Sequence, residues 1–226
     1  SNITAKKRLI QMGENKKNIF TVGSPDVDVI LGKNLPSLNK VKKRYEISYE
    51  NYAIAILHPI TTNTKNLKRE AEIFFSSLQK SQLNYILIYP NNDHGSEIIL
   101  NELIKYKKYN NFRIFPSIRF EYYLTLLKKS RFIIGNSSSG IMEAPYYGVS
   151  TINIGERQKN RLKSRIIKHV NFNQKQIIKA INFSKNRKIK IKNFFGKGNS
   201  AKKINKLLMT NKIWNISNQK NFIDII

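Results

Sequence analysis

The sequence contains no cysteine, and only three of its 226 residues are histidine. Without thiols the chain can form neither disulfide bonds nor a thiolate metal site. The histidines, His58, His94 and His169, are scattered and lack the i, i+4 spacing that places two metal ligands on one helix face. We therefore expect no metal site, and nothing in the sequence indicates another cofactor.

Long apolar runs are also missing. No run approaches the roughly 18 residues that a membrane-spanning helix requires. Lys6, Lys7 and Arg8 interrupt the apolar core that a signal peptide would need. We therefore expect a cytoplasmic protein that does not associate with membranes. Because the first residue is Ser1 rather than methionine, we expect either a processed start or a longer chain.

Acidic residues are scarce: 14 stand against 41 basic residues, which gives a net charge of +27. Such a charge is typical of proteins that bind nucleic acids, but those proteins gather basic residues in a stripe or a recognisable motif. Here the lysines are scattered from Lys6 to Lys220, and the densest stretch, 185–192, is short. The excess of lysine, asparagine and isoleucine matches AT-rich codons. We therefore expect no nucleic-acid partner, although the charge would attract anions at low salt.

Short apolar runs alternate with amphipathic segments along the chain. The apolar runs predict buried parallel strands, and apolar side chains repeating at i, i+3, i+4 and i+7 predict helices. The expected strands are 52–57, 85–89, 112–115, 131–134, 149–154 and 166–170. The expected helices lie around 67–78, 99–106, 120–127, 137–147, 174–183 and 200–209. Together they predict a doubly wound α/β fold with a parallel sheet.

Residues 1–35 do not follow this alternation. Within them we expect a strand at 19–22 and a helix at 27–31, and residues 35–39, which include Pro36, predict a hinge. We therefore expect residues 1–35 to be the end of a preceding domain with its crossover, and 36–209 to form the α/β domain. Residues 210–226 remain unassigned.

Ligands of doubly wound sheets bind beyond the carboxyl ends of the strands. The strongest segment at such a place is GNSSSG, residues 135–140, between a strand and the start of a helix. The free N–H groups and the positive dipole end of a helix attract phosphate, and small residues allow close approach. An ordinary N-cap would need one serine, whereas three stand in a row. The segment predicts an anion-binding turn, but not a P-loop, whose lysine is missing.

Three further residues near strand ends allow two interpretations each. Glu143, one turn into the expected helix, either accepts hydrogen bonds from vicinal ribose hydroxyls or compensates the helix dipole. His58, if protonated, would bind a diphosphate or give a proton to a leaving phosphate, or else it is structural. Arg157 either binds phosphate through its guanidinium fork or is one surface arginine of a basic chain.

Taken together, these segments resemble the UDP-N-acetylglucosamine 2-epimerase family. IGNSSSGIMEAPYYGVSTINIGERQKNR, residues 134–161, resembles the family signature. LHPITT, residues 57–62, resembles the hydrolysing branch, because the corresponding histidine of the non-hydrolysing branch is followed by arginines. Residues 89–96 and 195–204 also resemble the hydrolysing branch. Residues 5–9, 13–14 and 22–28 resemble the crossing between the family's two domains.

The resemblance implies a B-type glycosyltransferase-like fold with two Rossmann-like halves, of which this chain is the C-terminal, UDP-binding half. It implies a UDP-sugar substrate and a homo-oligomer when full length. It also implies roles for single residues. His58 would be the catalytic residue at the diphosphate and sugar, with Asn91 near the nucleotide, Ile118 at uracil through its backbone, Ser137 and Ser138 at phosphate, Glu143 at the ribose hydroxyls and Arg157 on the nucleotide side of the cleft.

The implied reaction eliminates UDP from UDP-N-acetylglucosamine across C1 and C2, and water then adds to give N-acetylmannosamine for sialic-acid-type sugar synthesis. The family's acidic residues that act at C2 belong to its N-terminal domain, which would precede Ser1. We therefore expect the chain alone to be inactive and to bind UDP weakly at best.

Other functions remain open at this point. Alternatives are a UDP-2,4-diacetamido-6-deoxy-sugar 2-epimerase of legionaminic acid synthesis, a non-hydrolysing 2-epimerase, a UDP-sugar glycosyltransferase and a basic nucleic-acid-binding module.

Overall fold

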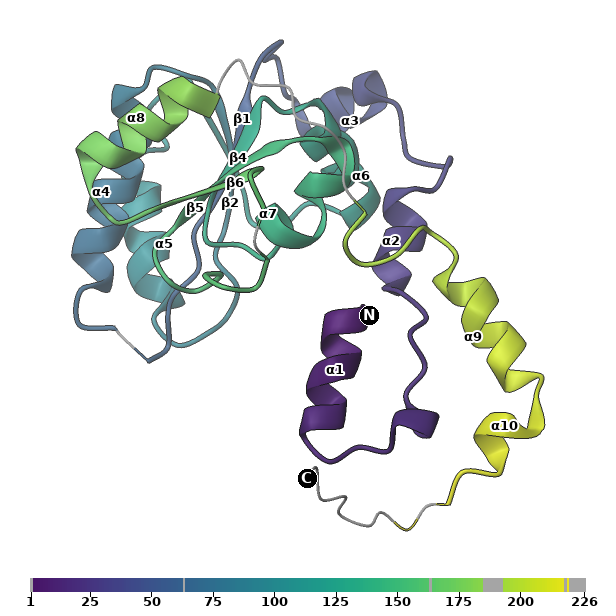
Figure 1. The fold of residues 1–226 in the computed structure, drawn as a ribbon. Helices are drawn as coiled ribbons and strands as arrows, with labels where there is room; N and C mark the ends of the chain where they lie inside the picture. Colours follow the sequence, from purple (N-terminus) through teal and green to yellow (C-terminus); the bar gives the residue numbers. More distant parts are fainter. Residues whose placement is uncertain (1, 63, 163, 185–192, 218, 220–226) are drawn as a thin grey trace. The chain divides into compact units, whose positions relative to one another are not determined.

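The computed structural model describes residues 2–62, 64–162, 164–184, 193–217 and 219 (Figure 1). The chain forms two compact units, which are described separately. The sheet unit is Leu35–Lys192, and the terminal unit combines Ser1–Asn34 with Asn193–Ile226.

The sheet unit contains a six-stranded sheet in which every pair of neighbours is parallel, in the order β3-β2-β1-β4-β5-β6. The strands are β1 (Ala53–Ile56), β2 (Tyr85–Ile88), β3 (Phe112–Phe115), β4 (Phe132–Gly135), β5 (Ser150–Ile154) and β6 (Ile167–Val170). The order reverses between β1 and β4, as in doubly wound Rossmann-like folds. All six predicted strands and the predicted fold class are confirmed.

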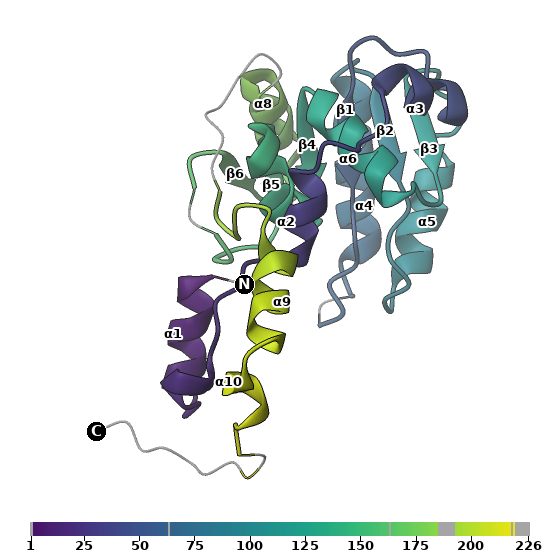
Figure 2. The ribbon, with the colours of Figure 1, turned by 90° about the vertical axis from the view of Figure 1, so that its right-hand side faces the viewer.

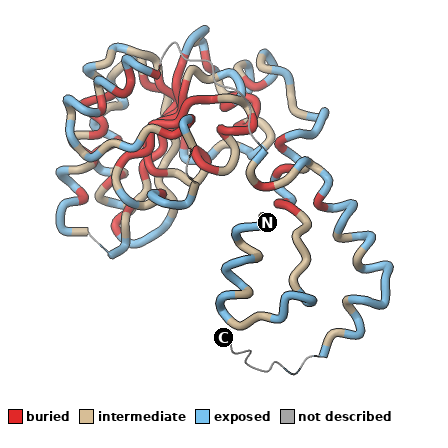
Figure 3. The backbone as a smooth tube through the Cα atoms, in the orientation of Figure 1, coloured by how far each residue is buried: buried red, intermediate tan, exposed pale blue. Residues whose placement is uncertain are grey.

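Helices cover both faces of this sheet (Figures 1 and 2). One face carries α4 (Leu67–Lys80), α5 (Ser96–Ile104) and α8 (Gln174–Ser184). The other carries α3 (Leu38–Tyr45), α6 (Phe120–Lys129), α7 (Ser139–Met142) and the 3₁₀ helix η2 (Ala144–Tyr147). Because both faces are covered, the inner strands are buried on both sides, and β1, β4 and β5 are buried along their whole length (Figure 3).

The main core lies between the sheet and the α4, α5 and α8 layer. Phe74 and Phe75 of α4 pack there edge to face, with ring centroids 5.2 Å apart, and neither is exposed by more than 2%. Burying one such side chain contributes about 1.5–3 kcal/mol relative to leaving it in water. This core therefore fixes the position of the strands, and with them the loops at the carboxyl ends.

The terminal unit contains α1 (Ile3–Gln11), the 3₁₀ helix η1 (Lys16–Asn18), α2 (Pro25–Ile30), α9 (Ser200–Leu208) and α10 (Asn211–Trp214). Asp28 of α2 holds the start of α9, because its carboxylate accepts hydrogen bonds from the backbone N–H groups of Ser200 at 2.9 Å and Ala201 at 2.7 Å. The Ser200 hydroxyl donates to the Ser24 carbonyl at 3.0 Å. Polar contacts therefore join the two ends of the chain.

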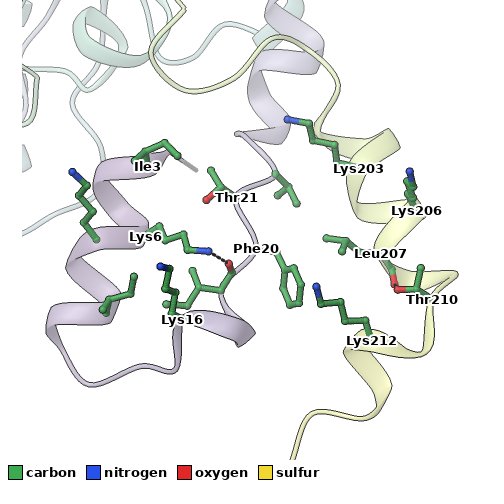
Figure 4. A pocket seen from close by; sticks show the side chains of 14 residues that line it. Ile3, Lys6, Lys16, Phe20, Thr21, Lys203, Lys206, Leu207, Thr210 and Lys212 are labelled. Atoms are coloured by element: carbon green, nitrogen blue, oxygen red, sulfur yellow. Dashed lines mark hydrogen bonds between the residues drawn. The ribbon is translucent and has the colours of Figure 1, made fainter. Parts of the chain in front are cut away.

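An apolar groove of about 910 Å³ runs between α1, residues 16–22 and the α9–α10 segment (Figure 4). Its floor includes Phe20 and Leu207, and lysines such as Lys6 and Lys203 stand around it. The Lys6 ammonium donates to the Ile19 carbonyl at 2.8 Å. Within the described residues, no helix is long and apolar enough to cross a membrane.

Three sequence predictions need correction or refinement. Residues 19–22 are not a strand: Ile19 has extended angles (φ −103°, ψ 110°), but the segment belongs to none of the six paired strands. The predicted helix over 137–147 is broken into α7 and η2, because Pro145 has no N–H to continue the helix. The predicted hinge at 35–39 overlaps α3, whose first turn is capped by the Ser37 hydroxyl.

The boundaries of the compact units fall between Asn34 and Leu35 and between Lys192 and Asn193. Residues 193–209, which include α9, belong with the N-terminal segment rather than with the sheet. The cap that Asp28 provides explains this grouping. The helices α1, α3 and α10 were not predicted, and α1 has no buried residue that could have produced a burial pattern.

Candidate functional site

Every candidate residue except Glu143 lies just beyond the carboxyl end of a strand. Because the strands are parallel, these ends lie along one edge of the sheet. In the order of the strands from β3 to β5, the edge carries Ile118, Asn91, His58, the 136–138 turn and Arg157. The sheet topology therefore brings residues 99 positions apart in the sequence, such as His58 and Arg157, to one place.

The turn after β4 starts at Gly135, which pairs in register with Ile56 of β1. Gly135 has φ +131°, and a Cβ there would lie 1.8 Å from the Ile56 carbonyl oxygen. Only glycine permits this approach. The sharp turn directs the following residues, Asn136 to Ser139, across the end of β1.

Asn136 connects this turn to the loops that follow β1 and β5. Its side-chain Oδ1 accepts from the His58 N–H at 2.7 Å, and its Nδ2 donates to the His58 carbonyl at 2.8 Å. Its own carbonyl accepts from Arg157 Nη1 at 3.0 Å and from Gln158 Nε2 at 3.2 Å. Asn136 and Gln158 are buried, with exposures of 0% and 2%.

The imidazole of His58 is neutral, and its hydrogen bond identifies the nitrogen that carries the proton. Nδ1 accepts a hydrogen bond from the backbone N–H of Asn91 at 3.0 Å, so Nε2 carries the proton. Burial lowers the pKa of His58 to about 4, the Arg157 charge adds to this, and Asp93 opposes it. The ring is therefore a neutral Nε2–H donor in the unliganded chain, whereas the sequence-based hypothesis assumed a protonated ring.

The three serines of the turn differ in their contacts. The Ser137 hydroxyl accepts from the Ser139 N–H at 3.3 Å, and the Ser139 hydroxyl pairs with the Tyr123 hydroxyl. Ser138 precedes α7 and makes no side-chain capping bond. The backbone N–H groups of Ser137 and Ser138 donate to no other group among the described residues. They are the amide donors that this turn could offer to an anion.

Because the predicted helix is broken into α7 and η2, a long helix dipole does not contribute to anion binding here. α7 has only four residues, so its dipole is much weaker than that of the expected helix over 137–147. Attraction for an anion must instead come from individual amides and from nearby cations. Glu143 likewise lies not one turn into a long helix but at the junction of α7 and η2.

Arg157 supplies a cation at the turn, because its Nη1 lies 3.0 Å from the Asn136 carbonyl oxygen. Burial lowers its pKa from the usual value, Asp93 opposes this, and Arg161 adds to the lowering. Because the ordinary pKa of arginine lies far above neutral pH, Arg157 keeps its charge at neutral pH. Its Nη1 is anchored on the Asn136 carbonyl, and the fork has further N–H donors to offer.

The structure links His58, Asn91, Arg157 and the serine turn by hydrogen bonds or through Asn136. Glu143 joins the turn through its backbone N–H, which donates to the Ser139 carbonyl at 3.1 Å, whereas Ile118 makes no such link among the described residues. Ile118 lies in the loop after β3, where the next residue, Arg119, donates its backbone N–H to the Tyr45 hydroxyl at 3.1 Å. No set of three or more histidine, aspartate or glutamate side chains is placed to hold a metal ion in the part of the chain that is described.

Sequence reasoning missed the connecting residues. Asn136 and Gln158 stood only as letters within the quoted segments 135–140 and 134–161. Tyr123 lay within the expected amphipathic helix 120–127, yet its buried hydroxyl pairs with that of Ser139. The sequence did contain a signal for Asn136: it is a polar residue at the end of a buried strand, where an amide without hydrogen-bond partners would be costly.

The chain matches a family model described as UDP-N-acetylglucosamine 2-epimerase over residues 1–209. A Neisseria meningitidis serogroup B protein named UDP-N-acetylglucosamine 2-epimerase is 44% identical over 229 residues, which cover 100% of this chain and 60% of the relative. A Campylobacter jejuni protein named GDP/UDP-N,N'-diacetylbacillosamine 2-epimerase (hydrolyzing) is 34% identical, over 72% of this chain and 43% of the relative. The chain thus spans about 60% or less of the length of these relatives.

Two solved structures share the fold. A UDP-GlcNAc 2-epimerase from Methanocaldococcus jannaschii in complex with UDP-GlcNAc and UDP aligns with a TM-score of 0.75 and 24% identity, over 92% of this chain and 59% of that chain. A UDP-GlcNAc 2-epimerase from Neisseria meningitidis bound to UDP-GlcNAc aligns with a TM-score of 0.68 and 18% identity, over 92% and 60%. These likenesses confirm the predicted fold class, that of the Rossmann-like domain of a B-type glycosyltransferase-like fold.

Proposed function

The chain belongs to the UDP-N-acetylglucosamine 2-epimerase family, and we propose that it is the UDP-binding part of a hydrolysing enzyme of this family. The proposed reaction converts UDP-N-acetylglucosamine and water to N-acetylmannosamine and UDP. The observation that carries the proposal is the set of donors on one sheet edge: the neutral His58 ring, the serine-turn amides and the Arg157 guanidinium.

These donors suit a departing diphosphate. When the C1–O bond of the sugar breaks, its electron pair and a negative charge move to the diphosphate. The Nε2–H of His58 and the fork of Arg157 stabilise that charge better than they stabilise the intact substrate, which lowers the barrier. A diphosphate beside His58 also favours the protonated ring, so a larger fraction of the residue carries a proton that it can donate to the leaving group.

The remaining steps involve groups outside the proposed role of this chain. A base removes the C2 proton as the C1–O bond breaks, which leaves a 2-acetamidoglucal. Water then adds its oxygen to C1 and a proton to C2, and inversion at C2 gives N-acetylmannosamine. We propose that residues 36–209 bind UDP, with Asn91 and Ile118 on the nucleotide, Ser137 and Ser138 on phosphate and Glu143 on the ribose.

The hydrolysing reaction is proposed on two grounds. The LHPITT segment, residues 57–62, resembles the hydrolysing branch, and relatives at 34% and 29% identity carry the word hydrolyzing in their names. Those two relatives are named for UDP-N,N'-diacetylbacillosamine, which makes a diacetamido-sugar the second candidate substrate. The relative at 44% identity is named for UDP-N-acetylglucosamine, which favours that sugar.

Calorimetric titration of this chain with UDP, UMP and uridine tests the binding proposal. We expect UDP to bind more tightly than UMP, and UMP more tightly than uridine, because the proposed donors recognise the diphosphate. Ser138→Ala should weaken UDP binding by about 1 kcal/mol, the value of one neutral hydrogen bond. Ser48→Ala, an exposed serine outside this edge, is the matched control.

Several outcomes would contradict the proposal. Equal affinity for UDP and uridine would remove the diphosphate site, and unchanged affinity in Ser138→Ala would exclude the Ser138 hydroxyl as a ligand. Binding of duplex DNA that falls steeply with salt, without UDP binding, would favour a nucleic-acid role instead. Release of N-acetylmannosamine by this chain alone would contradict the assignment of the C2 chemistry to other residues.

A further inference from the structure

We propose that Asn136 is a positioning residue, whose buried side chain and carbonyl hold His58 and Arg157 in a fixed relation to the serine turn, residues 137–139. The proposal rests on the proposed function, because it assigns the geometry of that same site. Asn136 itself has no exposed surface, so it acts through the residues it holds rather than by touching a ligand.

The side chain of Asn136 extends the pairing of β1 and β4 beyond the ends of both strands. Ile56 and Gly135 form the last pair of the ladder, and the Asn136 N–H then donates to the Ile56 carbonyl at 3.2 Å. Beyond this point the amide group replaces the missing backbone partner, because it accepts from the His58 N–H and donates to the His58 carbonyl, at 2.7 and 2.8 Å. His58 is thereby held by two bonds at once.

The orientation of the imidazole depends on this double contact. With its backbone fixed, His58 places Nδ1 at 3.0 Å from the Asn91 N–H, which leaves the proton on Nε2. A backbone shift of a fraction of an ångström would lengthen this bond. The ring would then exchange between tautomers and rotamers, and the Nε2–H donor would no longer be aimed in one direction.

The backbone carbonyl of Asn136 contacts the loop that follows β5, where Arg157 and Gln158 lie. It accepts from Arg157 Nη1 at 3.0 Å and from Gln158 Nε2 at 3.2 Å, which uses both of its lone pairs. Gln158 in turn accepts from Arg161 Nη1 at 2.8 Å. Asn136 thus anchors one donor of the Arg157 fork and leaves the others oriented for an anion.

The chemistry of the contact accounts for asparagine at this position. The pair of bonds to His58 needs one acceptor and one donor on a short planar side chain. An ionised aspartate has the acceptor but would face the His58 carbonyl with a second oxygen, and leucine offers neither group. Either replacement leaves a buried backbone group of His58 unsatisfied.

The test compares Asn136→Asp with the matched variant Asn153→Asp in this chain. Asn153 lies on β5 opposite Gly135, is 1% exposed, and contacts Gly155 and His169 rather than His58. Long-range ¹H–¹⁵N spectra of the histidine rings report the tautomer and the titration midpoint, and calorimetry reports UDP affinity. Hydrogen exchange of the His58 amide in the unchanged chain reports the bond to Asn136 without any substitution.

We expect the unchanged chain to show an Nε2–H tautomer at His58 and a protected His58 amide, although this residue lies beyond the end of β1. Asn136→Asp should mix the tautomers, raise the His58 midpoint by about 1 unit because a carboxylate now lies against the His58 backbone, and weaken UDP binding by at least about tenfold. Asn153→Asp should leave the His58 resonances unchanged and perturb those of His169.

The proposal is overturned if Asn136→Asp folds and keeps both the tautomer and the midpoint of His58. If this variant does not fold, exchange of the His58 amide in the unchanged chain decides: protection supports the proposal, and exchange as fast as in an open loop overturns it. If the unchanged chain does not bind UDP at all, the proposed function fails, while the spectra still decide on Asn136.

Discussion

The two units of the chain differ in how many of their large apolar side chains are exposed to solvent. Of the eleven large apolar side chains that are exposed within the described residues, only Ile104, Phe120 and Phe183 belong to the sheet unit. The other eight belong to the terminal unit, where Met209 is 80% exposed and Trp214 is 67% exposed. The sheet unit therefore contains a core that stabilises it alone, whereas the terminal unit depends more on local polar contacts.

The largest effect should come from Gly135→Ala, in the sheet unit. The new Cβ would lie 1.8 Å from a backbone oxygen of β1, and the residue has a positive φ. Neither strand can move without breaking the ladder, so we expect a loss of more than about 4 kcal/mol, enough to unfold many domains. Circular dichroism and urea unfolding measure this loss, and a cooperative transition near that of the unchanged chain would contradict the geometry.

A pair of aromatic substitutions sharpens the comparison between the units. Phe74→Ala removes a side chain with no exposed surface and should lower the free energy of unfolding by about 3–5 kcal/mol. Trp214→Ala removes a larger but mostly exposed side chain and should change it by less than about 0.5 kcal/mol. Urea unfolding of both variants is the measurement. Equal losses would mean that the terminal unit contributes a core of its own.

The success of the sequence predictions follows burial. The strands and most helices of the sheet unit were predictable because burial imposes an apolar pattern, as in Tyr85–Ile88, but α3, with Val41 as its one buried residue, was not. In the terminal unit α1 has no buried residue, and the apolar run at 19–22 was taken for a strand although the sheet provides no partner for it. Periodicity reports burial, so it gives little information where burial is incomplete.

The candidate site was predictable in position but not in detail. Parallel strands bring their carboxyl ends together whatever the loops contain, so the edge with His58 and Arg157 could be located from the sequence. The link through Asn136 could not, because it joins residues 78 and 21 positions apart by bonds that leave no periodic trace. The shortness of α7 also depends on a single residue, Pro145, whose effect the amphipathic pattern conceals.

His58 offers a pH-dependent test confined to the sheet unit. Its pKa is about 4 in the folded chain and 6.5 ordinarily, so the unfolded chain binds the proton more readily. The contribution of the neutral His58 ring to the free energy of unfolding is therefore fully present above pH 6.5. It falls as the pH drops and is lost below pH 4. The difference amounts to roughly 3 kcal/mol. Urea unfolding between pH 4 and 7 should show this slope in the unchanged chain and not in His58→Gln, and equal slopes would refute the neutral ring.

Asp28 offers the corresponding test in the terminal unit, with a smaller expected effect than that of His58. Partial burial would raise the pKa of Asp28, but hydrogen bonds from Ala201 and Ser200 outweigh it and lower that pKa. The cap is therefore present above the ordinary pKa of the carboxyl group and is lost as the pH falls through the lowered value. Asp28→Ala should weaken the start of α9 by about 1 kcal/mol, the usual value of an N-terminal cap.

Because the sheet unit has its own core, the loss of this cap should remain local. Hydrogen exchange of the Ser200 and Ala201 amides should accelerate in Asp28→Ala, while the amides of β1 and β4 keep their protection. Asp26→Ala is the matched control, since Asp26 lies on the same helix and accepts no bond from α9. Asp28→Ala could instead lower the protection of the sheet amides by the same free energy as that of the Ser200 and Ala201 amides. The two units would then unfold as one cooperative structure, and the boundary between them would reflect contacts in the fold rather than separate stabilities.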